Sequence, residues 1–248
     1  MKQASIEVVD AQVFSHNVSE EIKFSIEDAI NRSGQCTIAL SGGKTPAAIY
    51  RILSKPPLVE SIPWSKVILI WGDERWVAKD NHQSNYNLVD ETLLSKLIDK
   101  KPKVIAVDTT LKDVETGAKD YEEKLRKISG LKADEIPSID ILLLGIGEDG
   151  HTASLFPGSA ALKENKRICL AVTVKDAEIK ERITITFPVI IAAKKVFFIV
   201  TGEGKADIIK NILEGNEDEM VYPAMIYKKA KGNVTWFLDN GAASKLKT

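Results

Sequence analysis

The chain contains 248 residues, of which 28% are charged, and its formal net charge at pH 7 is −1. This length suits one large α/β domain, so we expect residues 1–248 to form a single domain. The near-zero net charge provides no broad field for nucleic acid or anionic lipid, and no apolar stretch approaches membrane-spanning length.

The N-terminus and the cysteines indicate a cytoplasmic protein. Residues 1–10 lack the apolar core of a signal peptide. Cys36 and Cys169 each lie beside or within an apolar, strand-like run and lack metal-ligand spacing. Buried thiols in a reducing cytosol account for them better than a disulfide scaffold does.

Apolar runs alternate with helical patterns along the whole chain. We expect strands at 37–40, 67–71, 103–107, 139–145, 168–174, 182–187, 195–201 and 234–238. We expect helices at 18–32, 46–54, 84–98, 114–128, 204–213 and 241–246. This alternation favours a doubly wound, Rossmann-like α/β fold, in which a mainly parallel sheet lies between two helical layers.

The first strand-to-helix loop reads Ser41-Gly42-Gly43-Lys44-Thr45-Pro46. It is not a P-loop, because the position that needs the first glycine of that motif holds Ile38. Pro46 suits the first turn of a helix, and the free amides at such a start bind anions. We favour a phosphate on a small molecule here; the alternative is a plain helix cap by Thr45.

Two more strand ends are followed by polar residues. Strand 67–71 leads into Gly72-Asp73-Glu74-Arg75, where a guanidinium can pair with phosphate or carboxylate. Strand 195–201 leads into a glycine turn with Lys205 at a helix start, where a cation is unfavourable unless an anion binds. Arg182 precedes an alternating strand, and such an arginine by itself is more often exposed.

The segment from Ile139 to Gly158 is the most informative part of the chain. A buried strand runs into Gly145-Ile-Gly147-Glu-Asp149-Gly150-His151, which places Asp149 and His151 where open α/β sheets bind substrates. The glycine spacing matches the dinucleotide fingerprint, but Glu148 and Asp149 put negative charge beside the supposed pyrophosphate. The other alternative is a simple strand-to-helix turn without a function. Such a turn would explain the glycines but would leave Asp149 and His151 unexplained.

Together these motifs resemble the 6-phosphogluconolactonase family from end to end. Ser41–Pro46, Asp73–Arg75, Ser84-Asn85, Gly145–Gly158, Arg182–Thr186 and Gly202–Lys205 occur in the order seen there. The most specific element is Gly-x-Gly-x-Asp-Gly-His-x-Ala-Ser-Leu-Phe-Pro-Gly. One departure is Lys44, where many members carry a small polar residue; it adds positive charge to the phosphate loop.

The resemblance implies a hydrolase that acts on a sugar-phosphate lactone. His151 is the expected general base, and Asp149 is expected either to orient it or to hold sugar hydroxyls. Arg75, Arg182 and Lys205, with the amides of Gly42 and Gly43, are expected to bind the phosphate and the developing oxyanion. Ser41, Lys44 and Thr45 complete the predicted binding loop. We expect no metal and no cofactor.

Two other functions remain open at this point. The related glucosamine-6-phosphate deaminase/isomerases carry a glutamate before Pro-Gly, where this chain has Phe156, which cannot relay a proton. Ammonia release from glucosamine 6-phosphate would reveal that activity. A non-catalytic sugar-phosphate sensor usually carries an output domain, and no basic helix-turn-helix segment is visible. We expect no nucleic-acid or membrane partner, and a monomer or small homo-oligomer.

Overall fold

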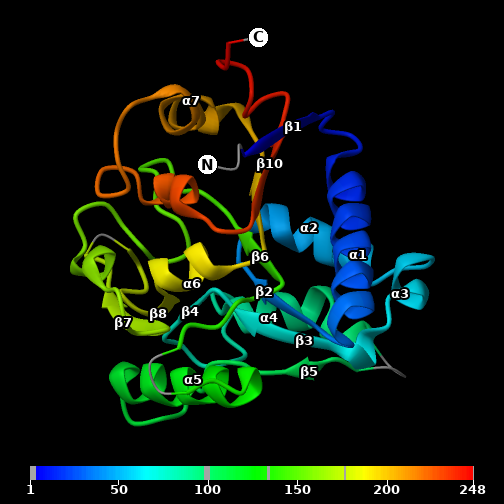
Figure 1. Ribbon diagram of the computed structural model, residues 1–248, viewed down its shortest axis with the longest axis vertical. Helices are drawn as coiled ribbons and strands as arrows, with labels where there is room; N and C mark the ends of the chain where they lie inside the picture. Colours follow the sequence, from blue (N-terminus) through cyan, green and yellow to red (C-terminus); the bar gives the residue numbers. More distant parts are fainter. Residues whose placement is uncertain (1–3, 98–100, 133–134, 176, 248) are drawn as a thin grey trace.

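The computed structural model describes residues 4–97, 101–132, 135–175 and 177–247. Within these residues, one sheet contains β1 (Ser5–Val9), β2 (Cys36–Leu40), β3 (Val67–Trp71), β5 (Lys103–Val104), β6 (Ile141–Leu144), β9 (Lys195–Val200) and β10 (Asn233–Asp239). The strand order is β1-β10-β9-β6-β2-β3-β5, and every neighbouring pair is parallel. The predicted parallel α/β sheet is therefore confirmed (Figure 1).

Helices cover both faces of this sheet. They are α1 (Phe14–Ser33), α2 (Lys44–Leu53), α3 (Leu58–Ser61), α4 (Asn85–Thr92), α5 (Val114–Ser129), α6 (Phe187–Ala192) and α7 (Ala206–Glu214). Side chains of α1, α2 and α4 share one apolar cluster with Ile141 and Leu143, whereas α5, α6 and α7 share the other with Leu142 and Leu144. Successive residues of a strand point to opposite faces, so β6 supplies both cores and the fold has three layers.

The order of the sheet reverses between β2 and β6. From β2 the chain proceeds through β3 and β5 toward one edge, then returns to β6 on the other side of β2 and continues through β9. The loops that follow β2 and β6 therefore leave adjacent strand ends in different directions. In open α/β sheets a crevice opens at such a point, and ligands bind there.

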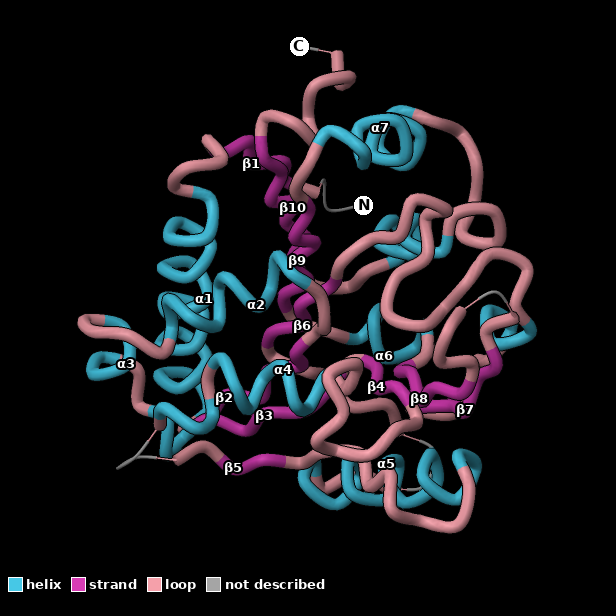
Figure 2. Tube along the Cα trace, turned by 180° about the vertical axis from the view of Figure 1, so that it is seen from behind, coloured by secondary structure: helices cyan, strands magenta, loops and turns pink. Residues whose placement is uncertain are grey.

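A second sheet lies beside the first and was not foreseen as separate. It pairs β4 (Asp73–Arg75), β8 (Glu181–Ile185) and β7 (Cys169–Thr173) antiparallel, in the order β4-β8-β7 (Figure 2). The predicted strands 168–174 and 182–187 thus exist but lie outside the parallel sheet. Their register sets Arg75 directly opposite Arg182.

Several predicted boundaries differ from the observed ones. Strand 67–71 is confirmed at both ends, whereas 103–107 pairs only over Lys103–Val104. The helix predicted at 84–98 ends at Thr92 and continues as a 3-10 turn, Leu94–Lys96, and residue 98 lies outside the described residues. The remaining 3-10 turns are Trp64–Lys66, Ala160–Lys163, Glu203–Lys205 and Pro223–Lys229.

The helix predicted at 241–246 is wrong. These residues form consecutive turns, because the Asp239 carboxylate binds backbone N–H groups that come before and after it in the chain. It accepts the backbone N–H of Ala242 at 2.7 Å and that of Gly202 at 3.0 Å. Gly241 then packs so close to the backbone of Gly202 and Glu203 that a side chain would not fit.

Four elements were not predicted, namely β1, β4, α3 and α6. β1 is an edge strand whose residues are mostly exposed, so it lacks a clear pattern of buried positions. α6 begins at Phe187, which the sequence assigned to the end of a strand, with Pro188 in its first turn. None of the helices in the described ranges is long and apolar enough to cross a membrane.

Glu74 fixes the start of α4. Its carboxylate is buried and accepts the backbone N–H groups of Arg75, Asn85 and Tyr86, each at 2.7 Å. It also accepts the hydroxyl of Ser84 at 3.1 Å. Burial is the largest influence and raises the pKa of Glu74, although the three N–H groups act in the opposite direction. The carboxylate thereby ties the segment after β3 to α4.

Glu74→Ala should lower the free energy of unfolding by at least about 2 kcal/mol, because several buried donors lose their acceptor. The folded-state pKa lies above the ordinary value of 4.5, so wild-type stability falls as the pH rises through that window. The deficit should therefore be largest in acid and shrink toward neutral pH in urea titrations. The exposed Glu60 provides the control: Glu60→Ala should change stability by less than about 0.5 kcal/mol. Equal losses in the two variants would contradict this account.

Candidate active site

The loop after β2 forms one wall of the site. Gly43 has a φ of 106°, a conformation that only glycine adopts readily, and it precedes the first residue of α2. Gly42 lies against the side chain of Asn85, which occupies the space that a Cβ would need. The hydroxyl of the buried Tyr50 donates to the Ser41 carbonyl at 2.9 Å and accepts the Ser41 N–H at 3.0 Å. These contacts hold the turn rigidly at the end of β2.

The helix that follows begins two residues earlier than predicted. α2 starts at Lys44, and its N-cap residue is Gly43, which makes no side-chain cap. Thr45 is therefore not a helix cap. Its hydroxyl instead lies 2.7 Å from that of Thr201, which joins this loop to the one after β9 that carries Lys205.

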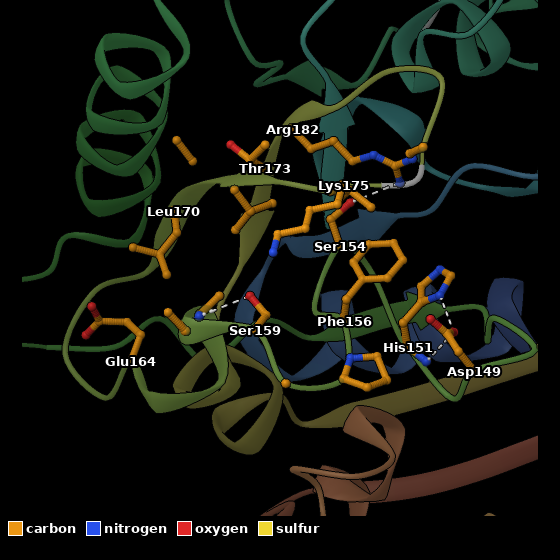
Figure 3. Close-up of a pocket in the computed structure, with 18 of the residues that line it drawn as sticks. Asp149, His151, Ser154, Phe156, Ser159, Glu164, Leu170, Thr173, Lys175 and Arg182 are labelled. Carbon is orange, nitrogen blue, oxygen red and sulfur yellow. Dashed lines mark hydrogen bonds and ion pairs between the residues drawn. The ribbon is translucent and has the colours of Figure 1, made fainter.

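The loop after β6 holds the imidazole. Nδ1 of His151 lies 2.6 Å from Oδ1 of Asp149, and the same oxygen accepts the His151 N–H at 3.1 Å. The Gly147 N–H donates to the His151 carbonyl at 2.9 Å, which folds the loop back on itself. A Cβ on Gly147 would overlap both the imidazole and the Asp149 carboxylate. The glycine therefore makes room for the contact between His151 and Asp149. Figure 3 shows that contact as a dashed line.

Two arginines face this loop from the second sheet. Nη1 of Arg75 donates to the Gln83 carbonyl at 2.7 Å, and its Nε is buried without a partner. Arg182 donates from Nε to the Ile179 carbonyl at 3.3 Å and from Nη1 to Oγ of Ser154 at 3.4 Å. Burial, with the Arg75 cation, lowers the pKa of Arg182, and Asp73 opposes this shift. Both guanidiniums remain charged at neutral pH.

A buried carboxylate, Asp73, connects the walls. Its Oδ2 accepts the Ser154 hydroxyl at 2.7 Å, and its Oδ1 accepts the amide of Asn85 at 3.2 Å. Ser154 therefore orders the loop after His151. Sequence reasoning assigned no role to Asp73 or Asn85; the available signal was that Asp73 follows a buried strand across one glycine.

Two cavities share His151 in their lining. The smaller has a volume of about 160 Å³ and is lined by Ser41, Gly42, Gly43, Asp73, Arg75, Asn85, Gly145, Ile146, His151, Ala153 and Arg182. The larger, about 1200 Å³, extends from Asp149 and Phe156 past β7. Arg75, His151 and Arg182 line both. Seven buried side-chain polar atoms of the described residues lack a hydrogen-bond partner, and three of them line the smaller cavity, in Ser41, Arg75 and Asn85.

Most predicted site residues come together here. Ser41, Gly42, Gly43, Arg75, His151 and Arg182 line the smaller cavity, and Asp149 lines the larger one beside His151. Lys44, Thr45 and Lys205 line neither cavity. Lys44 is exposed at the start of α2, and Lys205 ends the 3-10 turn before α7. Across the described ranges, no group of three His, Cys, Asp or Glu side chains could hold a metal ion.

The fold and the site define a three-layer α/β protein in which an imidazole–carboxylate pair lies beside two arginines. The chain matches the family described as glucosamine-6-phosphate isomerases/6-phosphogluconolactonase over residues 9–236, and it belongs to that family. A 6-phosphogluconolactonase of Synechocystis is 33% identical over 240 residues, covering 97% of each chain. One of Rattus norvegicus is 38% identical over 214 residues, covering 86% of this chain and 81% of the relative.

The solved structures agree with these relatives. The structure of 6-phosphogluconolactonase from Trypanosoma brucei superposes with a TM-score of 0.88 at 29% identity, covering 100% of both chains. The structural similarity therefore extends over the full length of the chain.

Gly147→Ala should separate His151 from Asp149 without unfolding the chain, because the three atoms nearest to a Cβ there all belong to those two side chains. A crystal structure of the variant should show the Nδ1–Oδ1 contact broken. Gly145→Ala is the matched control in the same loop, since a Cβ at that position meets nothing. An intact pair in the Gly147 variant would contradict the packing argument.

Proposed function

We propose that this protein hydrolyses 6-phospho-D-glucono-1,5-lactone to 6-phosphogluconate, the second step of the oxidative pentose phosphate pathway. The observation that supports the proposal is the His151–Asp149 pair, 2.6 Å apart, in which His151 lines both cavities together with Arg75 and Arg182. We further propose that it acts in the cytoplasm, as a monomer or small homo-oligomer.

The chemistry begins at the imidazole. When Nδ1–H donates to Asp149, the lone pair of His151 lies on Nε2, which accepts a proton from water. The resulting hydroxide equivalent adds to the lactone carbonyl, and the carbonyl electrons move to oxygen. Such a positioned base contributes about 10²–10⁴-fold to a rate. Asp149 stabilises the imidazolium that forms and keeps the ring in this tautomer.

Collapse of the tetrahedral adduct completes the reaction. The oxyanion re-forms the carbonyl, the bond from the former carbonyl carbon to the ring oxygen breaks, and that oxygen takes the proton from the imidazolium. The new acid ionises to the carboxylate product. Arg182 and Arg75 offer cationic donors to the oxyanion or phosphate at positions that the protein has already ordered.

The phosphate is expected at the loop after β2. At the N-terminus of α2 the N–H groups of Lys44 and Thr45 have no carbonyl of an earlier helical turn to bind, and the helix dipole favours an anion there. Ser41, Gly42, Lys44 and Thr45 belong to the same turn. Lys205 belongs to the segment after β9, which Thr201 joins to Thr45. The sugar would then span from this turn to His151 across the smaller cavity.

His151→Ala should lower kcat by about 10²–10⁴-fold, because water loses its base. The assay is hydrolysis of freshly prepared 6-phosphogluconolactone with spontaneous opening subtracted. His16→Ala on the exposed face of α1 is the control and should retain full activity. Near-normal turnover of the His151 variant would exclude this residue as the base.

The unphosphorylated gluconolactone should be a poor substrate, with kcat/KM lower by about 10²-fold or more, since charged hydrogen bonds to phosphate are lost. Lys205→Met should reduce this preference, whereas Lys210→Met, on the exposed side of α7, should preserve it. Equal specificity constants for the two lactones would contradict the phosphate site.

A further inference from the structure

The ring of Phe156 contacts both the imidazole and one of the arginines. It stacks on the His151 ring with centroids 4.1 Å apart and an interplanar angle of 27°. The guanidinium carbon of Arg182 lies over the same phenyl ring, 5.6 Å from its centroid. Figure 3 shows Phe156 beside His151 at the edge of the larger cavity. One apolar side chain thus touches the base and a cation of the site.

The backbone before Phe156 is held in a tight turn. Thr152 and Leu155 form an isolated antiparallel bridge, with the Leu155 N–H donating to the Thr152 carbonyl at 3.0 Å. Ala153 has a φ of 49°, which is uncommon for a residue with a side chain. Such conformations persist where the surroundings over-determine them, and they cluster at functional sites.

Side-chain contacts on each side fix this turn. Thr152 donates to the Gly145 carbonyl at 3.0 Å, and the Ser154 N–H donates to the Thr184 hydroxyl at 3.1 Å. Leu155 is completely buried in the core. Phe156 therefore returns to His151 at the end of a segment that has little freedom to move.

The imidazole otherwise depends on contacts at one edge. Asp149 binds Nδ1, and Gly147 leaves space for that pair, but a single hydrogen bond at Nδ1 leaves the ring free to tilt about it. A flat partner against the ring face removes that freedom. An aromatic face also attracts a cation, so it stabilises the imidazolium that forms during attack. This attraction partly offsets the repulsion between the imidazolium and the nearby guanidiniums.

We propose that Phe156 is a positioning residue, which aligns His151 for proton transfer. This inference rests on the proposed lactone hydrolysis. Because Phe156 acts through His151, its removal should lower kcat while substrate binding, which depends on other residues, stays nearly unchanged.

Phe156→Leu removes the flat ring and keeps an apolar side chain of moderate size, and Phe156→Tyr keeps the ring. The larger cavity beside Phe156 has space for the added hydroxyl. Phe24→Leu is the matched control, because Phe24 is 61% exposed on α1. Circular dichroism and thermal unfolding should establish that all three variants fold.

In the leucine variant kcat should fall by about 10–100-fold, the range expected for a misplaced group, with KM within about twofold of the wild-type value. The tyrosine variant should retain most of the activity. Nuclear magnetic resonance supplies a second readout, because the chain has only three histidines and the His151 signals are those lost in His151→Ala. A phenyl ring stacked on the imidazole shifts its carbon-bound protons upfield, and Phe156→Leu should abolish that shift.

Turnover of Phe156→Leu within about twofold of wild type would overturn the inference, as would unchanged His151 signals or a rise in KM that accounts for the lost kcat/KM. A wild-type chain that does not hydrolyse the lactone would instead refute the proposed function. The resonance comparison still tests the stacking in that case, so the two failures are distinguishable.

Discussion

The pairing of β2 with β6 is the constraint on which the site depends. These neighbouring parallel strands end at the same edge of the sheet, but the chain leaves them toward different sides. The Gly42-Gly43 turn and the Gly147–His151 loop therefore face one another across a crevice. Their proximity comes from the pairing of the two strands that they follow.

The second sheet contributes two positively charged side chains, Arg75 and Arg182, to this crevice. The β4–β8 register places Arg75 opposite Arg182, and like charges directly across a pair of strands are unfavourable without compensation. Asp73 supplies part of that compensation, because it counters the effect of burial and of Arg75 on the pKa of Arg182. A bound anion would supply the rest. The unpartnered Nε of Arg75 is consistent with a site whose polar groups are incomplete without a ligand.

The same short turn after His151 serves packing and chemistry together. Leu155 enters the core, Ser154 binds Asp73, and Phe156 reaches the imidazole within three successive residues. A substitution that shifts this turn would therefore disturb the base, an arginine and the buried carboxylate at once. The arrangement couples the stability of the second sheet to the geometry of the proposed base.

The sequence alone determined the elements whose signals are local. Strand 67–71 and helix 114–128 follow from apolar periodicity. The glycine loop is contiguous, so spacing singled out Asp149 and His151 but left open whether Asp149 orients His151 or holds the substrate. Tertiary structure decided the rest: the separate antiparallel sheet, the turns that replace the predicted helix at 241–246, and the roles of Asp73 and Asn85. Each depends on partners far along the chain: Arg182 for Arg75, Gly202 for Asp239 and Ser154 for Asp73. Periodicity reports which face a residue presents, whereas strand pairing and buried hydrogen bonds depend on which distant segments meet.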